Sequence, residues 1–274
     1  MTAHPAYPDI AVSLEGRVAV VEIRRPPNNF FDRALIMQLR EAFAIFDRDD
    51  ACRALVLCAQ GKNFCSGADF SNDARAQGDQ RPPDPVRGQQ AGQGGGSTNL
   101  YKEAVHLFRF GKPIVAAIQG AAVGGGLGLA MVADFRVACP ESRFVANFTR
   151  LGTHPGFGLT VTLPRAVGIA NAEMMFYAAE RITGEQAVAM GLASVLVPFD
   201  RVRTAAIEMA GRIAENAPLA MRATRATMRR GLADAVEAAT DHEFVEQDWL
   251  FRTRDFREGV RAMAARAVPD FEGR

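Results

Sequence analysis

Three consecutive glycines constrain this chain more than any other feature, because Gly124–Gly126 open a predicted helix directly after a predicted strand at residues 114–118. Each glycine costs about 1 kcal/mol of helix stability relative to alanine, so a run of three needs a physical reason. One reason is the approach of a ligand oxygen, since free N–H groups and the dipole at a helix N-terminus favour negative charge. The other is close packing, which Gly126 and Gly128 would serve.

A second glycine turn follows the predicted strand Leu55–Ala59. Gly67 lies in this turn, and amides released at a strand end can point into a cleft. The two turns do not match nucleotide-binding signatures. The dinucleotide-binding signature consists of G-x-G-x-x-G after the first strand and an acidic residue about 20 residues later. The chain does not contain these features in that order. No Gly-Lys-Ser/Thr of a phosphate-binding P-loop follows the three glycines either.

Strand and helix patterns alternate along the first 199 residues, which predicts an α/β fold with covered strands. Asp32 is the expected N-cap of a helix with one apolar face. From residue 200 onward, helical patterns replace strand signals. We therefore divide the chain into an α/β core, residues 1–199, and a helical C-terminal region, residues 200–274. Short apolar runs predict strands at residues 18–23, 55–59, 114–118, 135–138 and 194–197.

Residues 71–99 break the alternation. The stretch Gly78–Ser97 is rich in Gly, Pro and Gln and has almost no apolar content, so it cannot bury enough surface to order itself. We interpret it as a mobile loop. It is either a solvated insertion without a role or a lid that a ligand orders.

Composition excludes several classes of function. The formal net charge is +1, so no strong field favours nucleic acid or an anionic membrane. The four cysteines form no C-x-x-C pair and no cluster with histidine, so neither a metal site nor a disulfide framework is expected. No signal peptide and no membrane-spanning apolar run is recognisable, and reduced thiols fit a cytoplasmic protein.

Further segments stand in a fixed order with the two glycine turns: Arg25–Asn29, Phe64–Asp69, Lys112–Gly120, Gly124–Gly126, Ala133–Asp134, Leu163–Gly168, Ile182–Gly184, Ala187–Leu192 and Thr253–Gly259. In order and spacing, these segments resemble the crotonase, or enoyl-CoA hydratase/isomerase, superfamily over nearly the whole chain. Each segment is weak evidence alone, whereas the ordered set is highly specific.

The resemblance implies a crotonase-like spiral of ββα units with a C-terminal helical trimerisation region, assembled as a homotrimer or a dimer of trimers. It implies an acyl-CoA substrate, with no cofactor beyond the coenzyme A of that substrate. The thioester oxygen would be held by the backbone N–H groups of Ala68 and Gly125. The positions expected around coenzyme A are Lys62, Cys65, Ser66, Ala68, Asp69 and Gly125.

The chain departs from the superfamily where proton transfer is expected. Enoyl-CoA hydratases resemble one another in two glutamates, and the matching positions here are Gly128 and Phe148. Neither side chain can move a proton, so hydration by the paired-glutamate route is not expected. The glycine run also resembles that of 4-chlorobenzoyl-CoA dehalogenases. Their nucleophilic aspartate matches Gly156 and their assisting histidine falls near Tyr101, so that chemistry is not supported.

His154 is the histidine that lies inside a site motif, the turn of residues 153–158. Its ordinary pKa suits proton transfer near neutrality, which makes it a candidate acid or base. The alternative is a histidine that only shapes the turn before Pro155. Asn147, Thr149 and Tyr101 are further polar candidates. The acids of the last helices, Glu243, Glu246 and Asp248, are expected on a solvated face.

The leading hypothesis is therefore an enzyme of the enoyl-CoA hydratase/isomerase type that stabilises a thioester enolate or oxyanion. Alternatives are an isomerase or hydrolase of an acyl-CoA that uses His154, and a non-catalytic acyl-CoA-binding homologue that lost its acids. A scaffold that only mediates protein association would leave the three glycines unexplained.

Overall fold

The computed structural model of the protein describes residues 5–68 and 97–274. Its larger sheet has six strands in the order β1–β2–β3–β4–β6–β9. β1 pairs antiparallel with β2, and the other neighbours pair parallel. The strands are β1 (Ile10–Glu15), β2 (Val18–Ile23), β3 (Ala54–Ala59), β4 (Ile114–Ile118), β6 (Phe135–Ala138) and β9 (Val195–Leu196). The five predicted strands are confirmed, and β1 is an addition.

The central strands are buried along their whole length, as the predicted α/β fold requires. Every residue of β2, β3 and β4 is buried. Successive side chains point to opposite faces of a sheet. Thus Leu55 and Leu57 join the cluster on one face, whereas Val56 joins the cluster on the other. Because both faces are covered, these strands read as continuous apolar runs rather than as alternating patterns.

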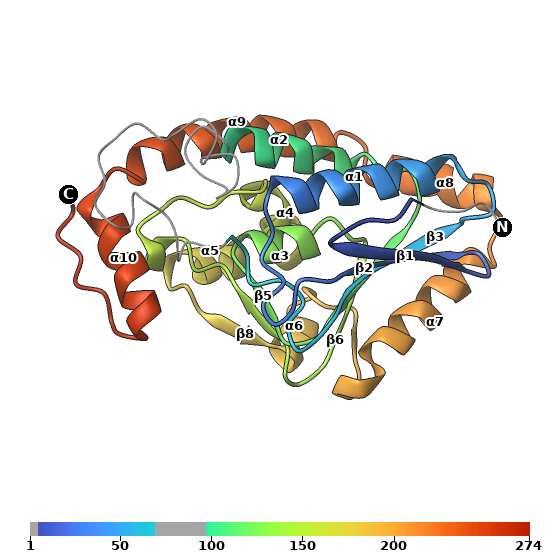
Figure 1. The fold of residues 1–274 in the computed structure, drawn as a ribbon, viewed down its shortest axis with the longest axis horizontal. Coiled ribbons are helices and arrows are strands. Elements are labelled where there is room, and N and C mark those ends of the chain that lie inside the picture. Colours follow the sequence, from blue (N-terminus) through green and yellow to red (C-terminus); the bar gives the residue numbers. More distant parts are fainter. Residues whose placement is uncertain (1–4, 69–96) are drawn as a thin grey trace.

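Helices cover the two faces of the larger sheet. On one side lie α1 (Arg33–Arg48), α2 (Ser97–Phe108) and α9 (Leu232–Leu250), side by side along the upper edge of the view (Figure 1). The carboxylate of Asp32 accepts the Leu35 N–H at 2.9 Å, so the predicted N-cap of α1 is confirmed. On the other side α7 (Val202–Ala214) packs against β2, β3, β4 and β6.

A smaller, three-stranded sheet carries the glycine run. It comprises β5 (Ala121–Val123), β7 (Arg143–Val145) and β8 (Arg181–Thr183), in the order β5–β7–β8. The helix α3 (Gly125–Ala130) begins two residues after β5, so the predicted strand–turn–helix unit contains one extra short strand. Strands of three residues are too short to show a period, which explains why the sequence did not indicate them.

The C-terminal region is helical, as predicted. After η2 (Phe199–Arg201), the described chain continues as α7, α8 (Pro218–Met228), α9 and α10 (Arg254–Ala265). The division at residue 199 stays a prediction, and α7 lies beyond it while packing on the sheet of the core. The remaining elements are η1 (Thr149–Leu151), α4 (Leu159–Val167), α5 (Ile169–Tyr177) and α6 (Gly184–Ala189).

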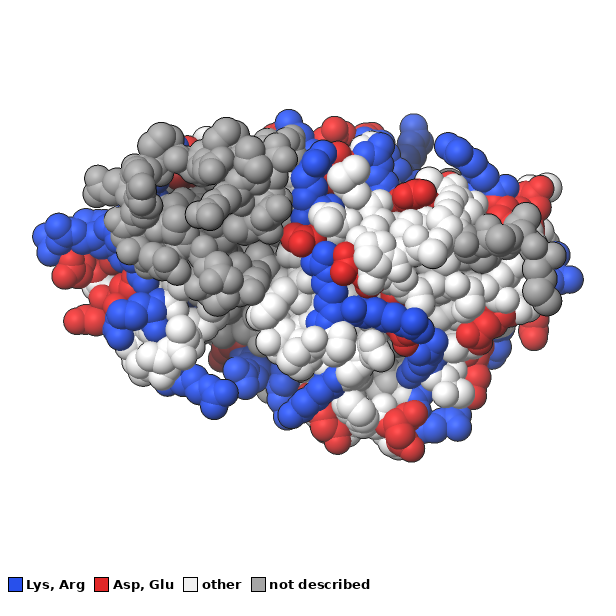
Figure 2. Space-filling view, in the orientation of Figure 1, with Lys and Arg blue, Asp and Glu red and all other residues white. Residues whose placement is uncertain are grey.

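Residues 71–96 of the loop predicted at 71–99 lie outside the described residues. Its last three positions, 97–99, belong to α2. Figure 2 shows basic and acidic side chains interspersed on the face in view, in keeping with the net charge of +1. None of the helices in the described ranges is long and apolar enough to cross a membrane.

Candidate active site

The glycine turn that follows β3 is held in place by hydrogen bonds from a buried asparagine. The side-chain amide of Asn29 donates to the carbonyl oxygens of Gln60 and Asn63, each at 2.8 Å. Asn63 in turn accepts the Ala121 N–H at 3.1 Å through its side chain. The segment after β3 is therefore tied on one side to residues 25–29 and on the other to the start of β5.

Residues 65–67 then run alongside β5 like a short extra strand. Cys65 forms a parallel bridge with Ala122, in which the Cys65 N–H donates to Ala121 at 2.9 Å. The Val123 N–H donates a hydrogen bond to the Cys65 carbonyl oxygen at 3.0 Å. Buried in this bridge, the Cys65 thiol has its pKa raised to about 12, which makes it a poor nucleophile.

Gly67 lies beside the backbone that leads into α3. Its φ of +86° is a conformation that favours glycine. A Cβ atom added there would lie 2.8 Å from the Val123 carbonyl oxygen and 3.6 Å from the Gly125 nitrogen. Gly67 therefore packs closely against the backbone that leads into α3, which leaves no room for a larger side chain at position 67.

Close packing accounts for the last two glycines of the run. A Cβ atom on Gly125 would lie 2.4 Å from the ring of Phe31. One on Gly126 would lie 2.1 Å from the Cys65 carbonyl oxygen. Such distances exclude any Cβ without movement of the neighbours. The packing interpretation of the run is therefore confirmed, while the approach of a ligand oxygen to the Gly125 N–H stays a prediction.

A cavity of about 370 Å³ lies where the two glycine turns meet. We call it the amide cavity, because Ala68 and Gly125, the residues of the two predicted amides, line it together with Ser66, Gly67 and Gly124. Its other walls come from residues after β7 and from α2, α9 and α10. The structure thus brings the two predicted amides to one cavity.

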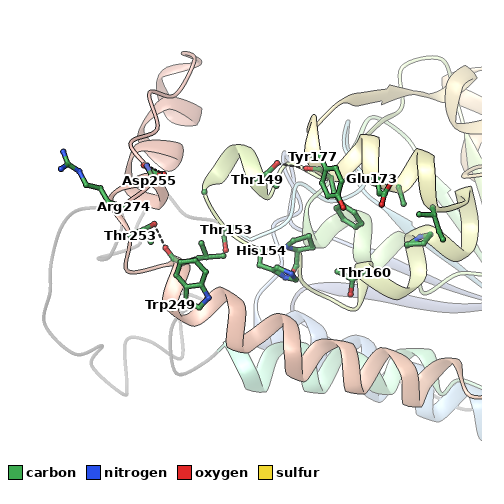
Figure 3. A pocket seen from close by; sticks show the side chains of 18 residues that line it. Thr149, Thr153, His154, Thr160, Glu173, Tyr177, Trp249, Thr253, Asp255 and Arg274 are labelled. Carbon is green, nitrogen blue, oxygen red and sulfur yellow. Dashed lines mark hydrogen bonds between the residues drawn. The ribbon is translucent and has the colours of Figure 1, made fainter.

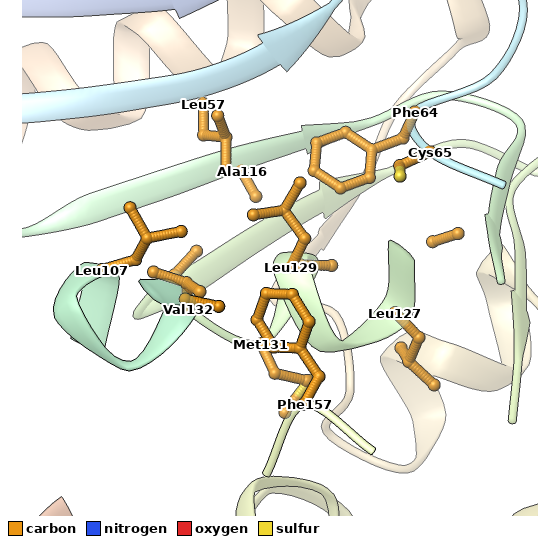
Figure 4. Packing of buried hydrophobic residues seen from close by; sticks show 14 of the residues in the cluster. Leu57, Phe64, Cys65, Leu107, Ala116, Leu127, Leu129, Met131, Val132 and Phe157 are labelled. Carbon is orange, nitrogen blue, oxygen red and sulfur yellow. The ribbon is translucent and has the colours of Figure 1, made fainter. Parts of the chain in front are cut away.

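Aromatic rings take the places where the superfamily's carboxylates are expected. A Cβ atom on Gly128 would lie 2.6 Å from Phe157, whose buried ring packs beside α3 (Figure 4). That ring meets Phe31 and Tyr101 edge-on, with centroids 5.8 and 5.7 Å apart. Phe148 itself lines the amide cavity. No carboxylate, lysine or histidine lines this cavity among the described residues.

The polar side chains that line the amide cavity are neutral: Ser66, Tyr101, Asn147, Thr153 and Gln247. Asn147 projects toward the glycine run, since its Oδ1 would lie 3.2 Å from a Cβ atom on Gly124. Gln247 reaches the cavity from α9 and donates to the His154 carbonyl at 2.9 Å. Burial raises the pKa of the Tyr101 hydroxyl, so this group stays protonated.

The structure places His154 in a different cavity, of about 750 Å³, together with Glu173, Tyr177 and Trp249 (Figure 3). Its Nδ1 lies 2.8 Å from the Pro155 carbonyl oxygen, within its own turn. Thr153 is the neighbour that lines both cavities. His154, the predicted acid or base, therefore lines the neighbouring cavity and does not line the amide cavity.

The remaining predicted coenzyme A positions lie in the glycine turn that follows β3 and differ in their exposure. Lys62 is exposed, Ser66 is half-buried in the wall of the amide cavity, and Cys65 is fully buried. Asp69 lies outside the described residues. The contacts of these residues with coenzyme A stay predictions.

The expectation that Glu243 lies on a solvated face of α9 is wrong. Its side chain is fully buried and accepts the N–H of Gly158 at 2.8 Å and the N–H and hydroxyl of Thr160 at 3.1 and 2.6 Å. Burial raises the pKa of this carboxyl above its ordinary value. The hydrogen bonds lower the pKa, but their effect is smaller than that of burial. Glu246 and Asp248 are partly exposed, as expected. Glu243 therefore fixes the turn that carries Phe157.

A family model described as enoyl-CoA hydratase/isomerase matches residues 13–274 of this chain. The chain is 30% identical to crotonyl-CoA hydratase of Syntrophomonas wolfei, over 97% of its length and 98% of the relative's. It is 31% identical to 2,3-dehydroadipyl-CoA hydratase of Escherichia coli, covering 97% of this chain and 99% of that one. An enoyl-CoA hydratase/isomerase structure from Pseudoalteromonas atlantica superposes with a TM-score of 0.81 at 26% identity, covering 96% and 100% of the two chains.

We expect Gly128→Ala to destabilise the protein by about 1–3 kcal/mol, because the new Cβ overlaps the ring of Phe157 in a packed core. Urea unfolding of the variant measures this loss. Gly211→Ala in α7 is the matched control, because its Cβ would meet nothing within 4 Å. The control gains helix propensity and stays at least as stable as the wild type. Equal stability of the two variants would contradict the packing of Phe157 against Gly128.

Proposed function

This chain belongs to the enoyl-CoA hydratase/isomerase family, and from that premise we propose that it binds an acyl-CoA and activates the thioester through its carbonyl oxygen. The backbone N–H groups of Ala68 and Gly125 are the two donors. The observation that supports the proposal is that Ala68 and Gly125 line one cavity, where Gly67 packs against the segment that leads into α3.

Two amides at this place are suited to hold a developing negative charge. Negative charge gathers on the thioester oxygen when an enolate or a tetrahedral intermediate forms. Fixed donors stabilise that charge without reorganisation, and one such donor contributes roughly 3–4 kcal/mol to lowering the barrier. Apolar rings around the cavity, such as Phe148, exclude water and so strengthen the two hydrogen bonds.

The neutral lining of the amide cavity limits the reaction further. The resemblance places the two hydratase glutamates at Gly128 and Phe148, and Phe157 fills the space beside Gly128. Hydration by paired glutamates is therefore not the proposed route. The step that we propose is stabilisation of an enolate or oxyanion, as in double-bond isomerisation or acyl cleavage.

One observation favours a second function, that of a non-catalytic acyl-CoA-binding protein. The described lining of the amide cavity contains no group that exchanges protons readily near neutral pH. Binding would then survive while turnover is lost. Incubation with crotonyl-CoA, followed through the enoyl-thioester absorbance, separates the two functions. Consumption of the thioester supports the enzyme, and unchanged absorbance together with tight binding supports the second function.

We further propose that helices α8 and α9 mediate assembly into a homotrimer or a dimer of trimers. Both helices expose large apolar side chains, namely Leu219, Met228, Val245 and Trp249. Large apolar side chains exposed in this way are characteristic of surfaces that a partner covers. We expect light scattering to give three or six times the 29.6 kDa of one chain. A mass of one chain at micromolar concentration would contradict the assembly.

We expect the carbonyl carbon of a ¹³C-labelled butyryl-CoA to shift downfield on binding, because hydrogen bonds from Ala68 and Gly125 polarise the C=O bond. Ala68→Pro removes one N–H and should abolish most of the shift, while slowing any turnover by about 10²–10³-fold. Ala68→Gly keeps the N–H and serves as the matched control. An unshifted carbonyl in the wild type, with the thioester bound, would rule out the two-amide hydrogen bonds.

We expect His154→Ala to change turnover less than about twofold, because the imidazole lies in the second cavity and not in the amide cavity. The comparison uses initial rates at saturating acyl-CoA. General acid–base catalysis is typically worth about 10²–10⁴-fold, so a role in proton transfer would be evident at once. A loss of that size would restore His154 as acid or base and would favour the isomerase or hydrolase that uses it.

A further inference from the structure

A third cavity, of about 450 Å³, gathers positive charge in its wall. Among the described residues, four arginines line it with a single carboxylate: Arg136, Arg165, Arg225, Arg229 and Asp134. We call it the arginine cavity. None of the residues that line it lines the amide cavity or the cavity of His154. A ligand of the arginine cavity would therefore occupy a site separate from both.

The carboxylate of Asp134 already has several donors. Its Oδ2 accepts the Ile114 N–H and Nε of Arg225, each at 2.8 Å. Its Oδ1 accepts Nη1 of Arg229 at 2.7 Å. The two guanidinium groups are largely buried, since the side chains of Arg225 and Arg229 are only 8% and 13% exposed. One negative charge thus lies between two buried positive charges and can balance only one of them.

Arg136 is buried without an ion pair to any carboxylate in the described part of the chain. Its Nε and Nη1 donate to the carbonyl oxygens of Leu192 and Ala133. Its Nη2 makes no hydrogen bond within the described ranges, and it is not one of the fully enclosed atoms there. Burial, and to a smaller extent the charge of Arg229, lower the pKa of this guanidinium to about 10. It therefore keeps its positive charge at neutral pH.

The wall of the arginine cavity carries three positive charges in excess. Buried charges are costly unless an opposite charge pairs with them. Asp47 is a further acid that acts on Arg225, but it lies outside the lining, where its Oδ1 accepts the Gly111 N–H at 3.0 Å. The attraction between charges depends on distance and not on which atom faces the cavity. An anion within the cavity would therefore supply the missing counter-charge.

Apolar side chains form much of the remaining wall of the arginine cavity: Met131, Phe135, Ile213, Met221, Met228 and Leu232. Methionine adapts its shape to different ligands, so this part of the wall suits a short hydrocarbon chain. The planar guanidinium group matches two oxygens of a carboxylate or a phosphate. The two parts of the wall together fit an anion that has an oxygen-bearing head and an apolar body.

We propose that the arginine cavity binds a small organic anion, with a carboxylate or phosphate head beside its arginines and a short apolar chain against its methionines. A free carboxylate and a phosphate ester share this chemistry. The inference does not rest on the proposed function, because the two cavities share no lining residue. A competing source of negative charge is an acidic side chain of a second copy, since Met228 also belongs to the surface that we propose for assembly.

Titration calorimetry with hexanoate, hexyl phosphate and hexan-1-ol tests the proposal, because the three ligands share one chain and differ in the head. We expect the wild type to bind at least one of the two anions about tenfold more tightly than the alcohol, as charge-assisted hydrogen bonds predict. The anion that binds more tightly identifies the head that the cavity prefers.

Two variants locate the anion. Arg165→Glu reverses a charge at an exposed position of the lining and should weaken anion binding by about tenfold, with the affinity for the alcohol unchanged. Arg212→Glu makes the same change of charge at an exposed position of α7 outside the lining, and this matched control should change the affinity less than about twofold. Arg136→Gln, if folded by its melting temperature, should bind anion and alcohol alike.

Three results would overturn the proposal. Equal affinity of the wild type for the anions and the alcohol would show that the charged head is not recognised. Absence of anion binding would do the same and would favour an acidic side chain of a second copy as the counter-charge. Anion binding by Arg165→Glu as tight as by Arg212→Glu would place the anion elsewhere on the molecule. This last comparison decides the location even if Arg136→Gln does not fold.

Discussion

The bridge between Cys65 and Ala122 is the contact on which the rest of the site depends. It joins the loop that follows β3 to the short strand that leads into α3, and Ala68 and Gly125, which follow these two segments, line one cavity. Gly67 and Gly126 are required because a Cβ on either would meet backbone atoms of the opposite segment. Aromatic packing and the polar side chains of the amide cavity surround this junction without forming it.

The aromatic packing explains why the junction opens into a neutral cavity. Phe157 occupies the space beside Gly128, and the buried carboxylate of Glu243 holds the turn that carries this ring. An acid is thus present near the cavity but is used for structure, with its oxygens bonded to Gly158 and Thr160. In the proposed function, charge stabilisation therefore depends on backbone amides, and neutral side chains line the space for the acyl chain.

Periodicity in the sequence predicts the parts of this molecule that repeat. The apolar runs of β2 to β4 and the stripe of α1 predict the larger sheet and its cover, because burial alone determines them. Gln247 was missed, although Leu232, Val236, Thr240, Glu243 and Gln247 follow the spacing of one buried helix face. The sequence could not indicate that α9 lies over the cavity, nor that His154 turns into a separate one, since both depend on tertiary packing.

A crystal structure of the protein with butyryl-CoA bound tests the central claim most directly. The account predicts the thioester carbonyl oxygen at about 2.7–3.1 Å from the nitrogens of both Ala68 and Gly125, the range of an oxyanion hole. It also predicts the acyl chain within the amide cavity, beside Phe148. A thioester bound in the cavity of His154, or a carbonyl oxygen turned away from the two amides, would contradict the account.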